Sequence, residues 1–299
     1  MASVTAPLRD DKVGLGIGLT LLAWGFFAAT DITVKWVIVM AGLPALQLAF
    51  MRYAVSLVLA FGSGATHGHL IQTLSRRDTI LVTFRASLLV LATALNFIAL
   101  KFLALSVTST ILNMAPIFVT LLAIPLLGER VGPWRIGAVC VGFIGALIII
   151  RPGSDAFQWA ILLPVINAVA IALFSILTRQ MAGRITPQTQ QVFVSAIGTI
   201  ALLPFAVVLW QSPETLTDWL LMISVGLWAW TGHELFARAH LHAEATVLSP
   251  FGYILILYMT LGGYILFDNF PDAATLLGAA IIIASGLLIW WRETRKVRQ

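Results

Sequence analysis

Long apolar runs separated by short polar breaks limit what this 299-residue chain can fold into. Each run is close to the roughly 20 residues that an α-helix needs to cross a hydrocarbon core of about 30 Å. Hydrophobic residues make up 60% of the chain and charged residues 10%, whereas soluble domains have about 45–50% and about 25%. Runs such as Ala138-Val139-Cys140-Val141 lack the alternation of a transmembrane barrel. An all-α polytopic membrane protein is predicted, and a soluble enzyme or nucleic-acid-binding domain is excluded.

The polar breaks divide the chain into ten predicted transmembrane helices. Helices 1 and 2 are joined by the short break Ala41-Gly42-Leu43-Pro44, which predicts a tight hairpin. The break between helices 3 and 4 is marked mainly by Lys101, and nine helices remain an alternative if that junction is continuous. The predicted spans are 13–39, 44–62, 79–100, 105–127, 132–150, 158–178, 189–210, 217–238, 245–267 and 273–291.

The distribution of basic residues predicts the orientation of these helices, because cytoplasmic loops are enriched in Lys and Arg. With both termini in the cytoplasm, the outer loops hold only Lys101 and Arg151. Thirteen of the eighteen basic residues then lie in cytoplasmic segments: Arg9, Lys12, Arg76, Arg77, Arg130, Arg135, Arg179, Arg184, Arg238, Arg292, Arg295, Lys296 and Arg298. We expect an integral protein of a bacterial inner membrane, functional as a monomer, with no nucleic-acid partner.

Motifs for catalysis or for a cofactor are missing from the sequence. There is no G-x-x-x-x-G-K-[ST] phosphate-binding loop, so the chain is not expected to hydrolyse ATP by itself. The pair His233-Glu234 resembles the start of a zinc-binding H-E-x-x-H helix, but the second histidine position is Ala237. A single cysteine, Cys140, excludes an intrachain disulfide. We therefore expect no enzyme activity, no cofactor and no metal site.

The sequence contains an internal repeat. Gly137-Ala138, Gly145 and Arg151 recur 141 residues later as Gly278-Ala279, Gly286 and Arg292. Since each half would contain five helices, an odd number, the second half would enter the membrane inverted. Inverted repeats are common in secondary transporters, where the substrate site lies near the midplane between the halves.

Several motifs resemble the EamA repeat of the drug/metabolite transporter superfamily. They are Trp24-Gly25 in helix 1, Arg52 in helix 2 and Leu127-Gly128-Glu129-Arg130 after helix 4. The second half is more divergent, with Phe267-Asp268-Asn269 at the position of the Gly-Glu pair. The resemblance implies five-helix repeats at 1–151 and 152–299, inverted symmetry, and export of metabolites, commonly amino acids. Bacterial aromatic amino acid exporters are the preferred comparison.

Polar and aromatic groups inside the spans are the candidate substrate contacts, because such groups usually face the bundle interior or a wet cavity. For each of them a purely structural role, as helix glue or core packing, is the alternative. The predicted cavity-lining residues are Trp24, Asn96, Asn113, Asn167, Trp230, His233, Phe251 and Tyr253.

Charged residues within the spans are candidate gating or coupling groups. Asp31 and Lys35 lie four residues apart and therefore share one helix face. They are predicted to form either a structural ion pair or an outer gate. Arg52 lies near mid-membrane depth and needs a partner there. Asp31, the acidic residue at similar depth, is the candidate. Arg85 and Glu234 are expected at comparable depth, as a cytoplasmic latch or a solvated salt bridge that includes Arg238.

Two prolines, Pro116 and Pro250, fall in helices 4 and 9, which are counterparts in the repeat. Proline removes a backbone hydrogen bond and kinks a helix, so these helices are predicted to bend between access states. The favoured function is a secondary transporter that exports small metabolites, most simply amino acids, through a central cavity. The alternatives are an uptake carrier for a nucleotide-like solute or a sugar, or an intramembrane enzyme or channel.

Overall fold

The computed structural model describes residues 10–62, 74–127, 133–152, 158–181 and 183–297. Within these ranges all regular structure is helical, as the sequence predicts. The Gly128-Glu129-Arg130 segment of the family resemblance lies outside the described residues. The elements are α1 (Asp10–Met40), α2 (Ala45–Gly62), α3 (Arg76–Phe102), α4 (Leu105–Leu112), α5 (Ala115–Leu127), α6 (Pro133–Ile150), η1 (Trp159–Ile161), α7 (Leu162–Met181), α8 (Pro187–Leu209), α9 (Leu216–Ala239), α10 (Ala245–Leu248), η2 (Ser249–Tyr253), α11 (Ile254–Phe267) and α12 (Ala273–Val297).

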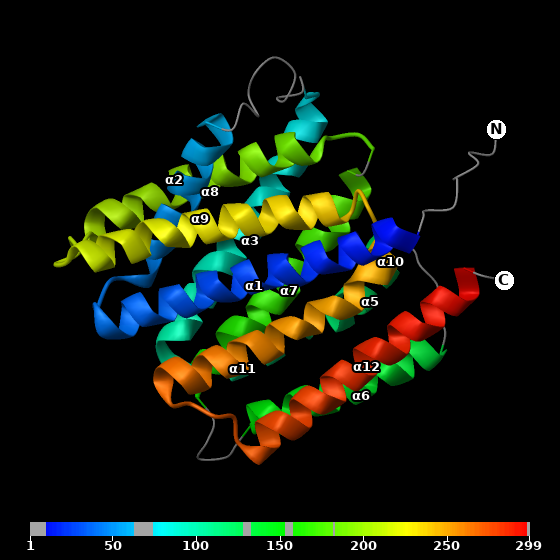
Figure 1. Ribbon diagram of the computed structural model, residues 1–299. Helices are drawn as coiled ribbons and strands as arrows, with labels where there is room; N and C mark the ends of the chain where they lie inside the picture. Colours follow the sequence, from blue (N-terminus) through cyan, green and yellow to red (C-terminus); the bar gives the residue numbers. More distant parts are fainter. Residues whose placement is uncertain (1–9, 63–73, 128–132, 153–157, 182, 298–299) are drawn as a thin grey trace.

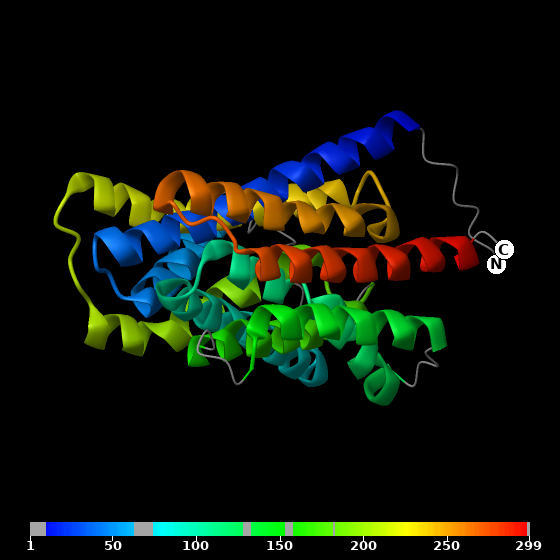
Figure 2. The ribbon, with the colours of Figure 1, turned by 90° about the horizontal axis from the view of Figure 1, so that it is seen from below.

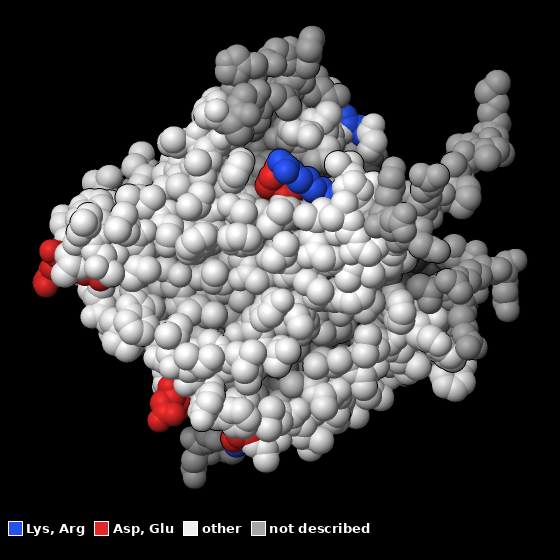
Figure 3. All heavy atoms as spheres, in the orientation of Figure 1, with Lys and Arg blue, Asp and Glu red and all other residues white. Residues whose placement is uncertain are grey.

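The outer surface of this bundle is apolar, which confirms a polytopic membrane protein. Among the described residues, seven helical segments are long and apolar enough to cross a bilayer. Large side chains such as Val208, Ile200 and Val207 are 70% or more exposed, and large exposed apolar surfaces are typical of proteins that contact lipid. On the face in Figure 3, one group of charged atoms lies near the upper middle, and the other clear groups lie toward the edges.

Short connections join the helices where the sequence places breaks. Gly42, between α1 and α2, has a φ of +69°, and Gly183, between α7 and α8, has a φ of +76°. Both angles lie in the left-handed region that favours glycine. The predicted junction near Lys101 is also found, because α3 ends at Phe102 and α4 begins at Leu105.

Two of the predicted spans are interrupted near their prolines. The span 105–127 is divided into α4 and α5 at Asn113-Met114, and Pro116 is the second residue of α5. The span 245–267 consists of α10, the 3-10 turn η2 and α11, with Pro250 in the first turn of η2. The expected kinks are therefore full breaks in the α-helical hydrogen-bond pattern, at both prolines.

Helices far apart in the sequence pack side by side (Figure 1). α1 lies against α9, α3 against α7, and α2 against α8, and α4 contacts α11. α6 and α12 form a close pair, and a Cβ on Gly145 would lie only 2.9 Å from the Gly278 carbonyl oxygen. The small-residue faces of these two helices therefore meet.

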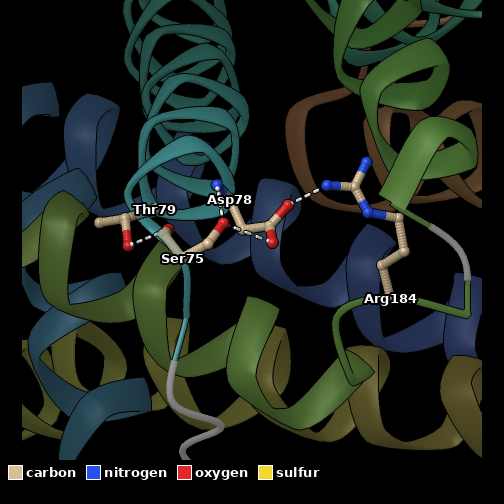
Figure 4. Close-up of polar contacts among 4 residues, drawn as sticks. All are labelled: Ser75, Asp78, Thr79 and Arg184. Atoms are coloured by element: carbon tan, nitrogen blue, oxygen red, sulfur yellow. Dashed lines mark hydrogen bonds and ion pairs between the residues drawn. The ribbon is translucent and has the colours of Figure 1, made fainter.

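The start of α1 and the end of α12 lie at the same end of the bundle. The start of α1 and the end of α12 both lie at the right in Figures 1 and 2. The start of α3 is tied to the α7–α8 connection, as Figure 4 shows: Ser75 caps the helix, and Asp78 forms an ion pair with Arg184. This ion pair joins the first half of the chain to the second.

Candidate functional site

One cavity of about 530 Å³ lies inside the bundle, within the range of about 300–1,000 Å³ of small-molecule sites. Its walls come from α1, α2, α3, the α4–α5 break with the first half of α5, α7, α9, η2, the start of α11, and α12. Ten of the predicted site residues line it: Trp24, Asp31, Arg52, Asn96, Asn113, Pro116, Asn167, His233, Pro250 and Tyr253.

Arg52 of α2 is held on one wall of the cavity by polar partners. Its Nη1 donates to Thr93 Oγ1 and to the Tyr53 hydroxyl oxygen, 3.2 Å away. Its Nη2 lies 3.4 Å from His233 Nε2. Since a guanidinium can only donate, this ring nitrogen must be the acceptor, and His233 is then neutral with its proton on Nδ1. Arg52 thus finds neutral acceptors within the membrane.

Asp31 of α1 has a partner other than the expected ones. Its Oδ1 accepts a hydrogen bond of 3.0 Å from Asn96 Nδ2 on α3. The expected ion pair with Lys35 is not formed among the described residues, because Lys35 Nζ donates to the Leu103 carbonyl oxygen instead. The cavity therefore holds a carboxylate and a guanidinium that are each bound to neutral side chains.

Aromatic rings form the wall between α1 and α9. The ring centroids of Trp24 and Phe27 are 5.5 Å apart, and those of Phe27 and His233 are 4.9 Å apart, with edge-to-face geometry. Gly252 lies beside Trp24, where a Cβ would be 3.2 Å from Trp24 Cζ2. A glycine in η2 thus lets the indole lie close to the backbone of the broken span.

Three asparagines line the cavity in different hydrogen-bonding states. Asn113 Nδ2 donates to the Ser109 carbonyl oxygen of its own helix, 2.9 Å away. Asn96 and Asn167 are 7% and 2% exposed. In the described part of the chain, the Oδ1 atom of each of these two has no hydrogen-bond partner.

Four predicted site residues are not among those that line the cavity: Trp230, Phe251, Arg85 and Glu234. Arg85 Nε donates to Thr178 Oγ1 at 2.7 Å, and its guanidinium lies 4.0 Å from the Phe174 ring centroid. Glu234 is paired with Arg238 at 2.8 Å on a partly exposed surface. The predicted solvated salt bridge is therefore found, and no Arg85–Glu234 ion pair is formed among the described residues.

Several residues that line the cavity are not among the predicted ones, including Phe27, Thr30 and Thr93. A helical period of three to four residues relates Phe27 to Trp24 and Asp31, and relates Thr93 to Asn96. One helical turn from a predicted residue therefore leads to Phe27 and Thr93, whereas Thr30 directly precedes Asp31 in the sequence.

The cavity stops short of one end of the bundle. Its lining reaches Asp31 on α1, Phe97 on α3 and Leu255 on α11. Beyond these, Lys35 bonds to the Leu103 carbonyl oxygen and lies 5.4 Å from the Phe267 ring centroid. We call the contacts of Lys35, Leu103 and Phe267 the closed end. In the other direction the lining extends to Trp290, close to the end of α12.

Comparisons with known proteins give relatives along the whole length. The riboflavin transporter of Vibrio cholerae is 31% identical over 91% of this chain and 92% of that protein. The pseudopaline exporter CntI of Pseudomonas aeruginosa is 27% identical over 92% and 95%. The S-adenosylmethionine uptake transporter of Rickettsia bellii is 26% identical over 94% and 95%.

A solved structure shares the fold, with a TM-score of 0.64 and 17% sequence identity over 96% of this chain and 99% of that chain. The family model described as the EamA-like transporter family matches residues 14–151 and again 158–291. These two matches cover most of the sequence. The chain therefore belongs to the EamA-like transporter family, a group of membrane transporters of the drug/metabolite superfamily.

Proposed function

We propose that this protein is a secondary transporter that exports a small metabolite, most simply an amino acid with an aromatic side chain, by alternating access. The observation that carries the proposal is that one cavity combines a carboxylate, a guanidinium and an aromatic wall: Asp31, Arg52, and Trp24 with Phe27. A zwitterionic head group matches two opposite charges, and a flat ring matches the aromatic wall. The bilayer and this solute are its proposed partners.

Ten crossings with inverted halves at 1–151 and 152–299 are part of this proposal. Beside the seven long spans, ten crossings require α9 and the shorter apolar stretches Ile136–Ile150 and Ala273–Leu288. α1 begins and α12 ends at the same end of the bundle, which is consistent with an even number of membrane crossings (Figure 2). Both ends are assigned to the cytoplasm of a bacterial inner membrane, on the excess of Lys and Arg in that set of loops.

Local structure supports the inverted repeat. Met-Ala-Gly occurs at 40–42 and again 141 residues later at 181–183, each time with a left-handed glycine. The cap Ser75 with Asp78 at the start of α3 corresponds to the cap Thr215 with Asp218 at the start of α9, 140 residues later.

Packing relations also support this symmetry. Under the proposed correspondence, α1 matches α7 and α9 matches α3. The contact between α1 and α9 therefore has a counterpart in the contact between α7 and α3. The two broken spans, α4–α5 and α10–α11, correspond as well. A two-fold relation of this kind allows one half to rock against the other around a fixed midplane site.

The closed end supports a state in which the cavity is sealed from the outer side. Lys35 joins α1 to the end of α3 and lies over Phe267 at the end of α11. Rocking would separate these contacts and close the opposite end. The breaks at Pro116 and Pro250 are the proposed hinges, because they leave fewer helical hydrogen bonds to distort.

Uptake of a flavin-like solute is the second candidate, and the 31% identity to a riboflavin transporter favours it. A flat ring with polar edges also fits an aromatic cavity that carries a few hydrogen-bonding groups. Relatives named as an exporter and as an uptake transporter have similar identities, 27% and 26%. Direction is therefore a part of the proposal that needs its own measurement.

Counterflow in proteoliposomes tests the proposal. Vesicles preloaded with unlabelled solute are diluted into labelled solute, across a panel of amino acids, nucleosides, sugars and riboflavin. We expect transient, saturable accumulation of an aromatic amino acid. Accumulation of riboflavin alone would establish the second candidate, and non-saturable flux of every solute would identify a channel.

Two tryptophan variants provide a matched pair for the aromatic wall. Trp24 lines the cavity and Trp230, which is also partly buried, does not. Trp24→Ala is therefore expected to weaken apparent affinity about tenfold, which corresponds to a lost aromatic contact of about 0.5–1.5 kcal/mol plus lost burial. Trp230→Ala is expected to leave affinity within about twofold. Equal effects of the two substitutions would contradict the assignment of the wall.

A further inference from the structure

The end of the cavity nearest the closed end contains hydrogen-bond acceptors that lack donors. Asp31 keeps spare acceptor capacity, because both oxygens of a carboxylate only accept, and among the described residues its donor is the amide of Asn96. This bond also sets the orientation of that amide. The NH2 group must face Asp31, and Oδ1 must therefore point elsewhere. Asn96 Oδ1 is buried and has no partner in the described part of the chain.

Asn167 of α7 also lines this cavity and carries a second unpaired, buried amide oxygen. The side chain is 2% exposed, and its Oδ1 has no partner among the described residues. α7 packs directly on α3, the helix that carries Asn96. Leaving a buried amide oxygen without a hydrogen bond destabilises the protein, so a bound group that donates to both oxygens offsets a cost that is already present.

The positive side chains that could fill this role are engaged elsewhere. Lys35 bonds to the Leu103 carbonyl oxygen at the closed end. Arg52 donates to Thr93, Tyr53 and His233. Asp31 and the two amide oxygens are thus left with an excess of acceptor capacity over donors.

We propose that Asp31, Asn96 and Asn167 form a subsite, which we call the acceptor end, that binds the protonated amino group of the transported solute. The inference rests on the proposed function and adds the orientation of the solute. An ammonium group has three N–H donors, which match one carboxylate and two amide oxygens. The carboxylate of the solute then faces Arg52, and the side chain lies against Trp24 and Phe27.

The acceptor end makes Asn96 and Asn167 specificity-determining residues. A solute whose amino group is acylated keeps one N–H donor and has no positive charge, so it loses most of this subsite. A solute that lacks only the carboxylate keeps the subsite and loses the contact with Arg52. The two kinds of analogue therefore report on opposite ends of the cavity.

The test is competition against labelled phenylalanine in counterflow, with N-acetylphenylalanine and phenethylamine as competitors. In the wild type we expect phenylalanine to compete at least tenfold better than its N-acetyl form. Asn167→Leu, which has a similar size and no polar atom, should raise the KM for phenylalanine about tenfold and reduce that preference to about twofold. Competition by the N-acetyl form should change little.

Ser195→Ala is the matched control. Ser195 is fully buried and its Oγ has no partner in the described residues, but it is not among the cavity-lining residues. This variant should keep both the KM and the preference. If Asn167→Leu and Ser195→Ala raise the KM and reduce the preference for phenylalanine to a similar extent, the buried polar groups matter only for folding. That result would overturn the proposal.

The remaining outcomes separate the inference from the function. If the wild type carries no amino acid, the proposed function and the inference fall together. If it carries phenylalanine and Asn167→Leu keeps the wild-type preference, only the inference falls. Transport that needs sodium in the wild type and loses this dependence in Asn167→Leu would assign the acceptors to a metal cation, which also overturns the proposal.

Discussion

Thr93→Val is the substitution that tests the polar wall of the cavity with the least change in shape. Thr93 is 5% exposed, and its hydroxyl accepts from Arg52 and lies 2.7 Å from the Tyr53 hydroxyl oxygen. Valine has nearly the same volume, but it cannot accept a hydrogen bond. Tyr53 keeps its bond of 3.1 Å to the Leu89 carbonyl oxygen. The loss therefore falls mainly on Arg52.

The magnitude follows from the charge of Arg52 and from its surroundings. A hydrogen bond to a charged group contributes about 1.5–3 kcal/mol in soluble proteins, and interhelical bonds in membranes average about 0.6 kcal/mol, up to about 1.7. We take about 1–2 kcal/mol for this half-buried guanidinium. Released from Thr93, Arg52 would turn toward Asp31, the carboxylate in the same cavity. The site would then neutralise itself and compete with a zwitterionic solute.

We therefore expect the KM for the solute to rise about 5- to 30-fold, equivalent to about 1–2 kcal/mol, in proteoliposome counterflow. The matched control is Thr20→Val, because Thr20 is also buried but, among the described residues, bonds only to the Gly16 carbonyl oxygen of its own helix. Thr20→Val should change the KM by less than about twofold. A Thr93→Val protein with an unchanged KM would refute the role given to Arg52.

Three further predictions concern gating and stability. Pro116→Ala should restore hydrogen bonds across the α4–α5 break and lower turnover several-fold with little change in KM; unchanged initial rates would contradict the hinge. Lys35→Met should weaken the closed end and raise alkylation, from the outer side, of a cysteine introduced at Ala92, which lines the cavity; unchanged labelling would remove Lys35 from the gate. Hydrogen bonds from Thr275, together with Arg151, lower the pKa of Asp272 to about 2. A depressed carboxyl pKa stabilises the folded state above the ordinary value of about 4, and this stabilisation is lost as the pH falls toward 2. The Tm difference between wild type and Asp272→Ala should thus stay constant from pH 8 to 5 and shrink below pH 4, and a change near neutral pH would contradict this.

Helix boundaries could be predicted from the sequence because they depend on local chemistry. The left-handed turn at Gly42 follows from a short break that ends in glycine and proline. The interruptions at Pro116 and Pro250 follow from the missing amide hydrogen of proline. These features need no knowledge of how the helices pack.

The partners of the charged side chains could not be predicted in the same way. Depth within a helix is readable from the sequence, but the direction in which a side chain points relative to another helix depends on tilt and rotation. Asp31 therefore meets Asn96 and not Lys35. For the same reason Trp24 lines the cavity and Trp230 does not, although both are tryptophans within spans. The proposed roles of Asn96 and Asn167 depend on which donors lie within reach of their amide oxygens, and this depends on how the helices pack.

Side-specific labelling of a cysteine at Ala92 tests the central claim, that a single cavity faces one side of the membrane at a time. Ala92 lines the cavity, and Cys140, which is exposed on α6, is first replaced by alanine. An impermeant thiol reagent is then added from either side, with and without saturating solute. We predict labelling mainly from the side on which α1 begins, and reciprocal changes on the two sides when solute is added. Equal and simultaneous labelling from both sides, with no effect of solute, would contradict alternating access.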